Sequence, residues 1–218
     1  MIKNVMKIVA FDPALSCGWC ISSLDTNSGT VTLLENGYIV TEKSEYVGDM
    51  CLEFQKAALN IIEKYDDICE IVMEDYMFSK SKCQGAQLNV FLRGALMMLC
   101  RQLNKPYWIM SVSNWKSIIA GRSMPTRECV KYYGKALANK IFIQEALWLR
   151  YNVRFPNHSI SHKTGKPISL KYDIVDATGI NIAHVYANHN IKVVCNDISN
   201  SPDVSMKCNK KMYSYTEI

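Results

Sequence analysis

The chain has 218 residues, of which 49% are hydrophobic and 21% are charged, a composition typical of one globular domain and unlike that of disordered chains. Its most apolar stretch, residues 88–100, is too short to cross a membrane and contains Arg93, so no membrane-spanning segment is expected. The nine cysteines show no framework spacing and the N-terminus lacks a secretory pattern, which predicts reduced thiols and a cytoplasmic location in a bacterial or host cell.

Charge is distributed unevenly along the chain, behind a formal net charge of +5. Residues 1–78 carry five Lys/Arg against thirteen Asp/Glu, whereas residues 79–150 carry twelve against two. A solvated surface ordinarily mixes both signs, so the basic middle of the chain predicts a surface for a polyanion or an acidic partner. Ordinary surface charge is the alternative interpretation.

The first part of the chain predicts three antiparallel strands followed by a helix and a fourth strand. Residues 5–11 form a β-branched apolar run typical of a central strand, and residues 18–25 and 29–40 are typical of two strands joined by a turn. Apolar residues at three- and four-residue steps predict a helix over 44–65. The segment 69–76 is then expected to be a fourth strand that ends in acidic residues.

The rest of the chain predicts a fifth strand among helices. The expected elements are, in order, a helix over 81–103, a strand over 106–112, a short helix over 114–119, a long helix over 126–151, a loop over 154–169 and a last helix over 170–187. This order predicts an α/β fold, a five-stranded mixed sheet with helices on both faces. We expect one domain over 1–190, with an inserted loop at about 154–169, and a polar basic tail over 191–218 with one short strand.

Four acidic residues occupy positions where their side chains can converge. Asp12 ends the first predicted strand, and Glu74 ends the fourth. Asp173 and Asp176 are three residues apart in the last helix, so they lie on one helix face, which continues with small and apolar residues suited to packing on the sheet. Each acid alone has an ordinary explanation in a turn, a strand end or a helix first turn. Together they predict one shared pocket.

Such a pocket requires a cation. Two like charges about 4 Å apart repel by roughly 4 kcal/mol at an effective dielectric constant near 20. Ligands that are all oxygen select Mg²⁺ or Mn²⁺ over zinc. Two such ions can activate a water and stabilise the leaving oxygen of a phosphodiester. The predicted chemistry is therefore phosphodiester hydrolysis with two Mg²⁺ or Mn²⁺ ions.

The stretches that carry these acids resemble a known family. FDPALSCGW (11–19), IVMEDYMFSK (71–80) and KYDIVDATGI (171–180) are similar to the acidic motifs of RuvC-type Holliday junction resolvases, in the ribonuclease-H-like superfamily. SNWKSIIAGRSMPTRE (113–128) resembles the basic segment of that family, including its phage- or virus-encoded members. Ala14 replaces the glycine that the family carries after Asp-Pro. The resemblance implies a ribonuclease-H-like sheet and enzymes that act as dimers on four-way junctions.

The resemblance also implies roles for individual residues. It places the four acids at the metal-ligand positions and Lys116 among the catalytic residues near the scissile phosphate. The predicted DNA-binding residues are Met77, Phe78, Lys80, Lys82, Lys116, Arg122, Arg127, Lys131 and Lys135, and of these the resemblance implies Lys80 with Met77 or Phe78, Lys116 and Arg127. Arg127, Lys131 and Lys135 also step by four along the long predicted helix, which predicts a basic stripe for phosphates. A solvated helix face is the alternative.

Other features are assigned no chemistry. A redox or zinc role for Cys17 and Cys20 is disfavoured, because this Cys-x-x-Cys enters a strand and has no second ligand pair. His184 and His189 are interpreted as surface or hydrogen-bonded histidines and not as ligands. Small residues within 85–95 permit close helix approach, either at a dimer axis or inside the monomer.

The combined prediction is an Mg²⁺-dependent endonuclease that resolves four-way and other branched DNA junctions. One alternative is a ribonuclease-H-like nuclease for flaps, forks or RNA/DNA hybrids. Another is a junction-binding protein that does not cleave, which would have no need to gather repelling acids. An actin-like ATPase is disfavoured because further glycine-rich phosphate loops are missing from the sequence.

Overall fold

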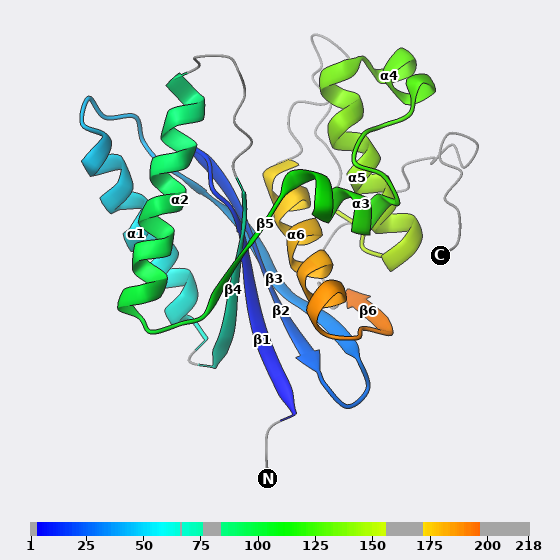
Figure 1. Ribbon diagram of the computed structural model, residues 1–218, viewed down its shortest axis with the longest axis horizontal. Coiled ribbons are helices and arrows are strands. Elements are labelled where there is room, and N and C mark those ends of the chain that lie inside the picture. Colours follow the sequence, from blue (N-terminus) through cyan, green and yellow to red (C-terminus); the bar gives the residue numbers. More distant parts are fainter. Residues whose placement is uncertain (1–3, 66, 76–83, 156–171, 197–218) are drawn as a thin grey trace.

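The computed structural model describes residues 4–65, 67–75, 84–155 and 172–196. These residues form one six-stranded sheet in the order β5-β4-β1-β2-β3-β6 (Figure 1). The strands are β1 (Val5–Asp12), β2 (Ser16–Asp25), β3 (Thr30–Val40), β4 (Ile68–Glu74), β5 (Tyr107–Met110) and β6 (Val193–Asn196). β1, β2 and β3 pair antiparallel, whereas β4 pairs parallel to β1 and β5 parallel to β4, as expected for the mixed sheet.

The five expected strands are all present, and the short strand expected in the tail is β6, which joins the same sheet at its edge as a sixth strand. β6 pairs parallel to β3, from Thr30 opposite Val193 to Leu33 opposite Asn196. The polar, basic composition after residue 190 predicted a tail with at most one short strand, and composition does not reveal where such a strand pairs. The division into a domain and a tail at residue 190 stays a prediction.

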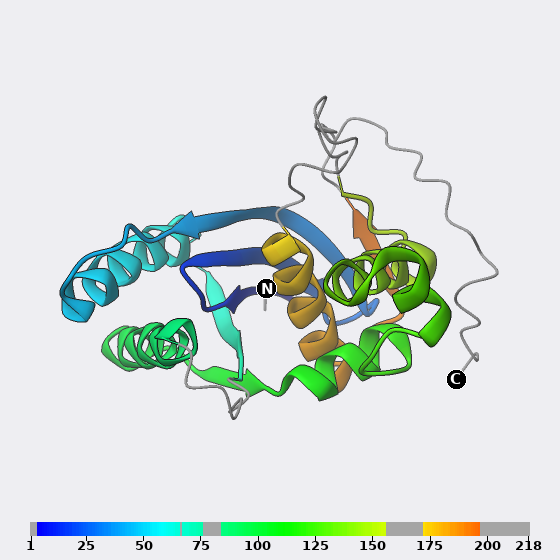
Figure 2. The same ribbon diagram turned by 90° about the horizontal axis from the view of Figure 1, so that it is seen from above.

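Helices cover both faces of the sheet, as expected. The helices are α1 (Val47–Glu63), α2 (Gln84–Gln102), α3 (Val112–Ala120), α4 (Arg127–Tyr133), α5 (Lys135–Tyr151) and α6 (Tyr172–Asn188). α1 and α2 lie on one side, and α6 lies on the other with α3 and α5 outside it (Figure 2). No helix among the described residues has both the length and the apolar composition needed to cross a membrane.

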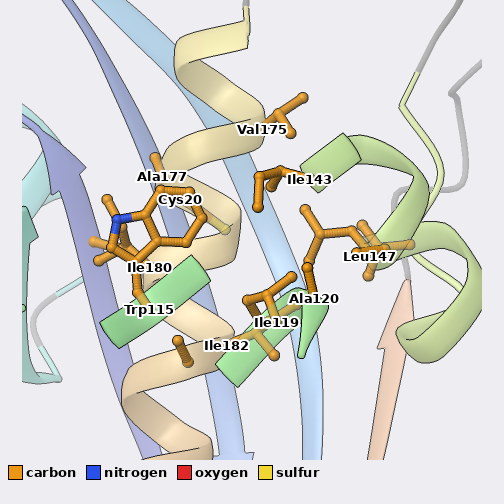
Figure 3. Packing of buried hydrophobic residues seen from close by; sticks show 14 of the residues in the cluster. Cys20, Trp115, Ile119, Ala120, Ile143, Leu147, Val175, Ala177, Ile180 and Ile182 are labelled. Carbon is orange, nitrogen blue, oxygen red and sulfur yellow. The ribbon is translucent and has the colours of Figure 1, made fainter. Parts of the chain in front are cut away.

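The central strand β1 divides the core between the two faces because its side chains alternate. Ile8 and Ala10 belong to the cluster formed with α3, α5 and α6, while Val9 and Phe11 belong to the cluster formed with α1 and α2. In the first cluster, Trp115 lies flat against α6 (Figure 3). The helix α6 therefore packs against β1 and β2 on one side and against α3 and α5 on the other, which fixes the position of the acids that it carries.

The long helix expected over 126–151 is two helices. Gly134 stands between α4 and α5 with φ 77° and ψ 153°, a conformation that favours glycine and ends the helix. The prediction that Arg127, Lys131 and Lys135 form one stripe along a single helix is therefore wrong. Arg127 and Lys131 lie on α4, and Lys135 begins α5.

Glu145 on α5 gives a pH-dependent stability. The residue is 5% exposed, and its Oε2 has no hydrogen-bond partner within the described part of the chain. Burial raises the pKa of its carboxyl group from 4.5 to about 7. The folded protein then binds more protons than the unfolded chain between pH 4.5 and 7, so its stability falls as the pH rises through that window.

We expect Glu145→Gln to raise the free energy of unfolding by about 2 kcal/mol at pH 8 and to change it little at pH 4. Urea unfolding of both proteins at the two pH values measures this. Glu128→Gln on exposed α4 serves as the matched control and should show no such pH dependence. An equal effect of Glu145→Gln at both pH values would contradict the assignment.

Candidate active site

Two of the four acids lie at the ends of neighbouring strands. Asp12 closes β1 and Glu74 closes β4, and the residues before them, Phe11 and Met73, are partners in the parallel ladder. Because parallel strands end at the same edge of a sheet, the two carboxyl groups come close enough to share a hydrogen bond. This pair is the part of the site that the sheet alone positions.

The other two acids come from the first turns of α6, which approaches β2 closely. A Cβ atom added to Gly18 would lie 1.9 Å from the backbone oxygen of Asp173, so only glycine fits there. The Asp173 carboxylate accepts a 2.8 Å hydrogen bond from Ser16 Oγ on β2. Asp176 is 5% exposed and repels both Asp12 and Glu74 electrostatically. The structure therefore brings all four acids to one edge of the sheet.

The electrostatics of this edge are unfavourable to negative charge. Burial raises the pKa of Asp12 well above its ordinary value, and repulsion from Glu74 and Asp176 raises it further. Burial also raises the pKa of Glu74, followed by repulsion from Asp176, while the indole Nε1–H of Trp115 donates a 2.7 Å hydrogen bond to Glu74 Oε1 and opposes the shift. The site holds more negative charge than its own hydrogen bonds compensate.

Lys140 on α5 supplies a positive charge that the sequence interpretation missed. Its Nζ lies 2.6 Å from Asp176 Oδ2. Burial lowers its pKa, but the attraction of Asp176, and then of Asp12 and Asp173, outweighs burial and holds the pKa above its ordinary range. A single lysine in the apolar stretch LANKIFI (137–143) was the only available signal.

Of the remaining predicted residues, one lies near the acids, four lie elsewhere in the described part of the chain, and four lie outside it. Lys116 lies near Glu74, because its charge lowers the pKa of that carboxyl group, and its Nζ is 5.1 Å from the centre of the Trp115 ring. Arg122 is half-buried just after α3, and the three residues of the expected stripe are exposed. Outside the described residues lie Met77, Phe78, Lys80 and Lys82, as does the predicted loop over 154–169 from residue 156 onward.

The cysteine pair lies in the interior beside this site and has no activated thiol. Cys17 and Cys20 are both buried on β2 and both free. Burial raises the pKa of both thiols, that of Cys20 to about 12. Since the thiolate is the reactive form, neither sulfur is suited to redox chemistry or metal binding at neutral pH.

The four acids fit a hard divalent ion. Their donors are all carboxylate oxygens, which Mg²⁺ and Mn²⁺ prefer. Asp176 Oδ1 is buried and has no hydrogen-bond partner among the described residues, so one oxygen of the cluster is available to a ligand. Ser16 donates a hydrogen bond to Asp173 Oδ2, and Trp115 donates one to Glu74 Oε1, so both carboxylates are held in a fixed orientation. Residues around a metal site commonly orient its ligands in this way. The role of the four acids as metal ligands stays a prediction.

Comparison with known proteins places the chain beside junction resolvases. No protein-family model matches it. It is 27% identical over 184 residues to the protein named crossover junction endodeoxyribonuclease RuvC of Ehrlichia ruminantium, covering 84% of this chain and 98% of that one, and 25% identical to that of Ehrlichia canis, covering 85% and 99%.

Solved structures agree in fold. The Thermus thermophilus RuvC structure, also solved with a Holliday junction substrate, matches with a TM-score of 0.58 at 15% identity, over 85% of this chain and 97% of that one. The yeast mitochondrial Holliday junction resolvase Ydc2 matches with a TM-score of 0.51 at 16% identity, over 85% and 82%. The predicted resemblance and the ribonuclease-H-like fold are thereby confirmed.

Proposed function

We propose that this protein is a divalent-metal-dependent endonuclease that cuts four-way DNA junctions and other branched DNA. The observation that carries the proposal is the meeting of four carboxylates, contributed by residues up to 164 positions apart, at one sheet edge in a chain similar to RuvC over most of its length. A protein that only bound junctions would gain nothing from gathering acids that repel one another. We place its action in the cytoplasm of a bacterial or host cell, because the spacing of the nine cysteines in the sequence shows no disulfide framework.

The chain's own residues divide the work at this edge. Asp12, Glu74, Asp173 and Asp176 would hold two Mg²⁺ or Mn²⁺ ions, which when bound supply an activated water and stabilise the leaving oxygen. Trp115 fixes the direction of the Glu74 carboxylate through its 2.7 Å hydrogen bond. Lys116, one residue further along α3, is placed to neutralise a non-bridging oxygen of the scissile phosphate.

Exposed basic residues beside this edge offer contacts for the DNA backbone. Arg127 and Lys131 on α4, with Lys135 at the start of α5, carry three positive charges with Glu128 as the nearby acid in the sequence. Because α4 and α5 are separate helices, these charges form two short groups and not one straight stripe. Such contacts bind phosphates without reading base sequence, so binding should weaken as salt rises.

The test is a cleavage assay on matched substrates. Purified protein is incubated with labelled four-way junctions, flaps, forks, RNA/DNA hybrids and linear duplex, each with and without Mg²⁺. The proposal expects Mg²⁺-dependent nicks at the branch of the four-way junction. Exclusive cleavage of hybrids, or tight junction binding with no cleavage in either Mg²⁺ or Mn²⁺, would overturn it.

The active dimer implied by the resemblance would use the outer surface of α1 and α2. Leu52, Phe91 and Met98 there are 50%, 52% and 63% exposed, and they border an apolar groove that also includes Gly94, beside which a Cβ atom would meet open space. Exposed large apolar groups that share one groove are typical of a protein interface. We propose that two copies pack through this surface.

We expect Met98→Glu to convert a dimer to a monomer at micromolar concentration, because two buried carboxylates would face one another or the groove of the second copy. Sedimentation velocity measures the change. Met124→Glu provides the matched control, since Met124 is also exposed, at 58%, but lies outside α1 and α2. A wild-type protein that sediments as a monomer at all concentrations would contradict the proposed interface.

A further inference from the structure

A second cluster of metal-binding side chains lies at the opposite end of α6 from the acids. Glu70 lies near the start of β4, His184 lies in the last turns of α6, and His189 follows the helix directly. In Figure 1 this end of α6 is orange, and the end that carries Asp173 and Asp176 is yellow. The nuclease mechanism proposed above uses none of the three residues, so the cluster requires its own explanation.

The three side chains converge on one point. His184 Nε2 lies 2.7 Å from Glu70 Oε2, and His189 Nε2 lies 3.1 Å from the same oxygen. Their three ligand atoms all lie within 4.8 Å of one another. Glu70 and His184 are buried, whereas the His189 side chain is 23% exposed and leaves a route from solvent.

We propose that Glu70, His184 and His189 form a second metal site, which binds Zn²⁺ or a similar borderline divalent ion with water as the fourth ligand. Two imidazoles and one carboxylate form an established ligand set for zinc, and nitrogen donors select zinc over the Mg²⁺ that an all-oxygen site prefers. The two Nε2 atoms now lie closer to the carboxylate oxygen than ligands around a shared ion do. Binding would therefore separate these atoms by a few tenths of an ångström.

A cluster joined only by hydrogen bonds is the competing explanation, and Asn188 distinguishes the two. The Asn188 amide lies 3.1 Å from His184 Nδ1, and its Nδ2 also donates a 3.0 Å hydrogen bond to the His184 backbone oxygen. A metal on Nε2 places the imidazole proton on Nδ1, so the amide must turn its oxygen toward that nitrogen. A carboxylate at position 188 would accept that proton without turning.

The ion would join β4 to the C-terminal end of α6. α6 also carries Asp173 and Asp176 in its first turns, and Glu74 ends the same strand, β4, that carries Glu70 near its start. The two metal sites therefore share both of the elements that position them. We expect the zinc to act on stability, by fixing α6 against the sheet, and not on the phosphodiester directly.

The experiment measures zinc binding without DNA. Chelator-treated full-length protein is titrated with Zn²⁺, and zinc content and thermal unfolding are recorded for wild type, Glu70→Gln, His189→Asn and the surface control Glu63→Gln. We expect the two cluster variants to lose one equivalent of zinc relative to wild type and control. At 100 times the dissociation constant, zinc should raise the Tm of the wild type by roughly 5–10 °C, and this rise should be absent from both variants.

Two further readouts separate the metal site from alternatives. Co²⁺ in place of Zn²⁺ should give the visible absorption of four-coordinate cobalt in wild type and Asp12→Asn but not in Glu70→Gln. Asn188→Asp should bind zinc several-fold more tightly than wild type. Equal zinc content and equal Tm shifts in wild type and Glu70→Gln would overturn the proposal and leave only a hydrogen-bonded cluster. Loss of nuclease activity plays no part in the result, so this proposal and the proposed function can fail separately.

Discussion

Asp12→Asn and Glu74→Gln are expected to lower the rate of junction cleavage by at least about 10³-fold while leaving the affinity for junctions within a few-fold of wild type. Each change removes one of the carboxylates proposed as metal ligands but keeps the shape of the side chain. Loss of a residue that only hydrogen-bonds to a metal ligand already lowers metal affinity or activity by about 10–100-fold. Loss of a ligand itself should therefore lower activity further. Single-turnover cleavage of a labelled junction in Mg²⁺ and a binding titration in Ca²⁺ measure the two quantities.

The same two variants are expected to be more stable than the wild type in the absence of metal, although they lose cleavage. Because burial and the neighbouring acids raise the pKa values of Asp12 and Glu74, their ionised forms destabilise the metal-free protein at neutral pH. Neutral replacements should therefore raise the Tm measured in chelator. Asp49→Asn, at an exposed position in the first turn of α1, is the matched control. Cleavage at the wild-type rate by either variant would refute the proposed ligand roles.

Lys140→Met is expected to destabilise the protein in the absence of divalent ions and to increase its affinity for them. The Lys140 ammonium, 2.6 Å from Asp176 Oδ2, offsets part of the negative charge of four carboxylates. Removing one member of a buried ion pair costs about 3–5 kcal/mol, and the partial exposure of Lys140 reduces this to about 2 kcal/mol. Without the lysine, a divalent ion no longer competes with an ammonium for Asp176. Thermal unfolding in chelator and across a Mg²⁺ titration measures both effects.

The position of the charge, and not the loss of any lysine, should decide the outcome. Lys135→Met changes an exposed residue at the start of the same helix and should leave both stability and Mg²⁺ affinity unchanged. If Lys140→Met weakened Mg²⁺ binding, the lysine would be a supporting element of the ion site and the competition described here would be wrong.

Sequence patterns located the four acids because each sits where a local rule applies. Asp12 and Glu74 end apolar runs that only a buried strand explains, and the spacing of Asp173 and Asp176 places them on one helix face whatever the tertiary structure. The meeting of these elements required one further assumption, that β1 and β4 are neighbours. The parallel ladder between them bears out this assumption.

The features that sequence reasoning missed depend on contacts between distant elements. Lys140 and Asp176 are 36 positions apart, and Glu70 and His184 are 114 apart, so no local period connects them. The break at Gly134 was hidden because one glycine within a helical pattern is compatible with a continuous helix. Only its positive φ, a property of the backbone, separates α4 from α5.

The indole of Trp115 has a practical consequence for following metal binding at the acidic edge. This ring is fully buried, packs against Gly179 of α6 and donates its N–H to Glu74. Any ion that draws electron density from that carboxylate alters the polarity around a natural fluorophore. Its emission would therefore report ion occupancy in real time, and variants that keep this tryptophan while replacing Trp19, Trp108 and Trp148 would isolate its signal without an added dye.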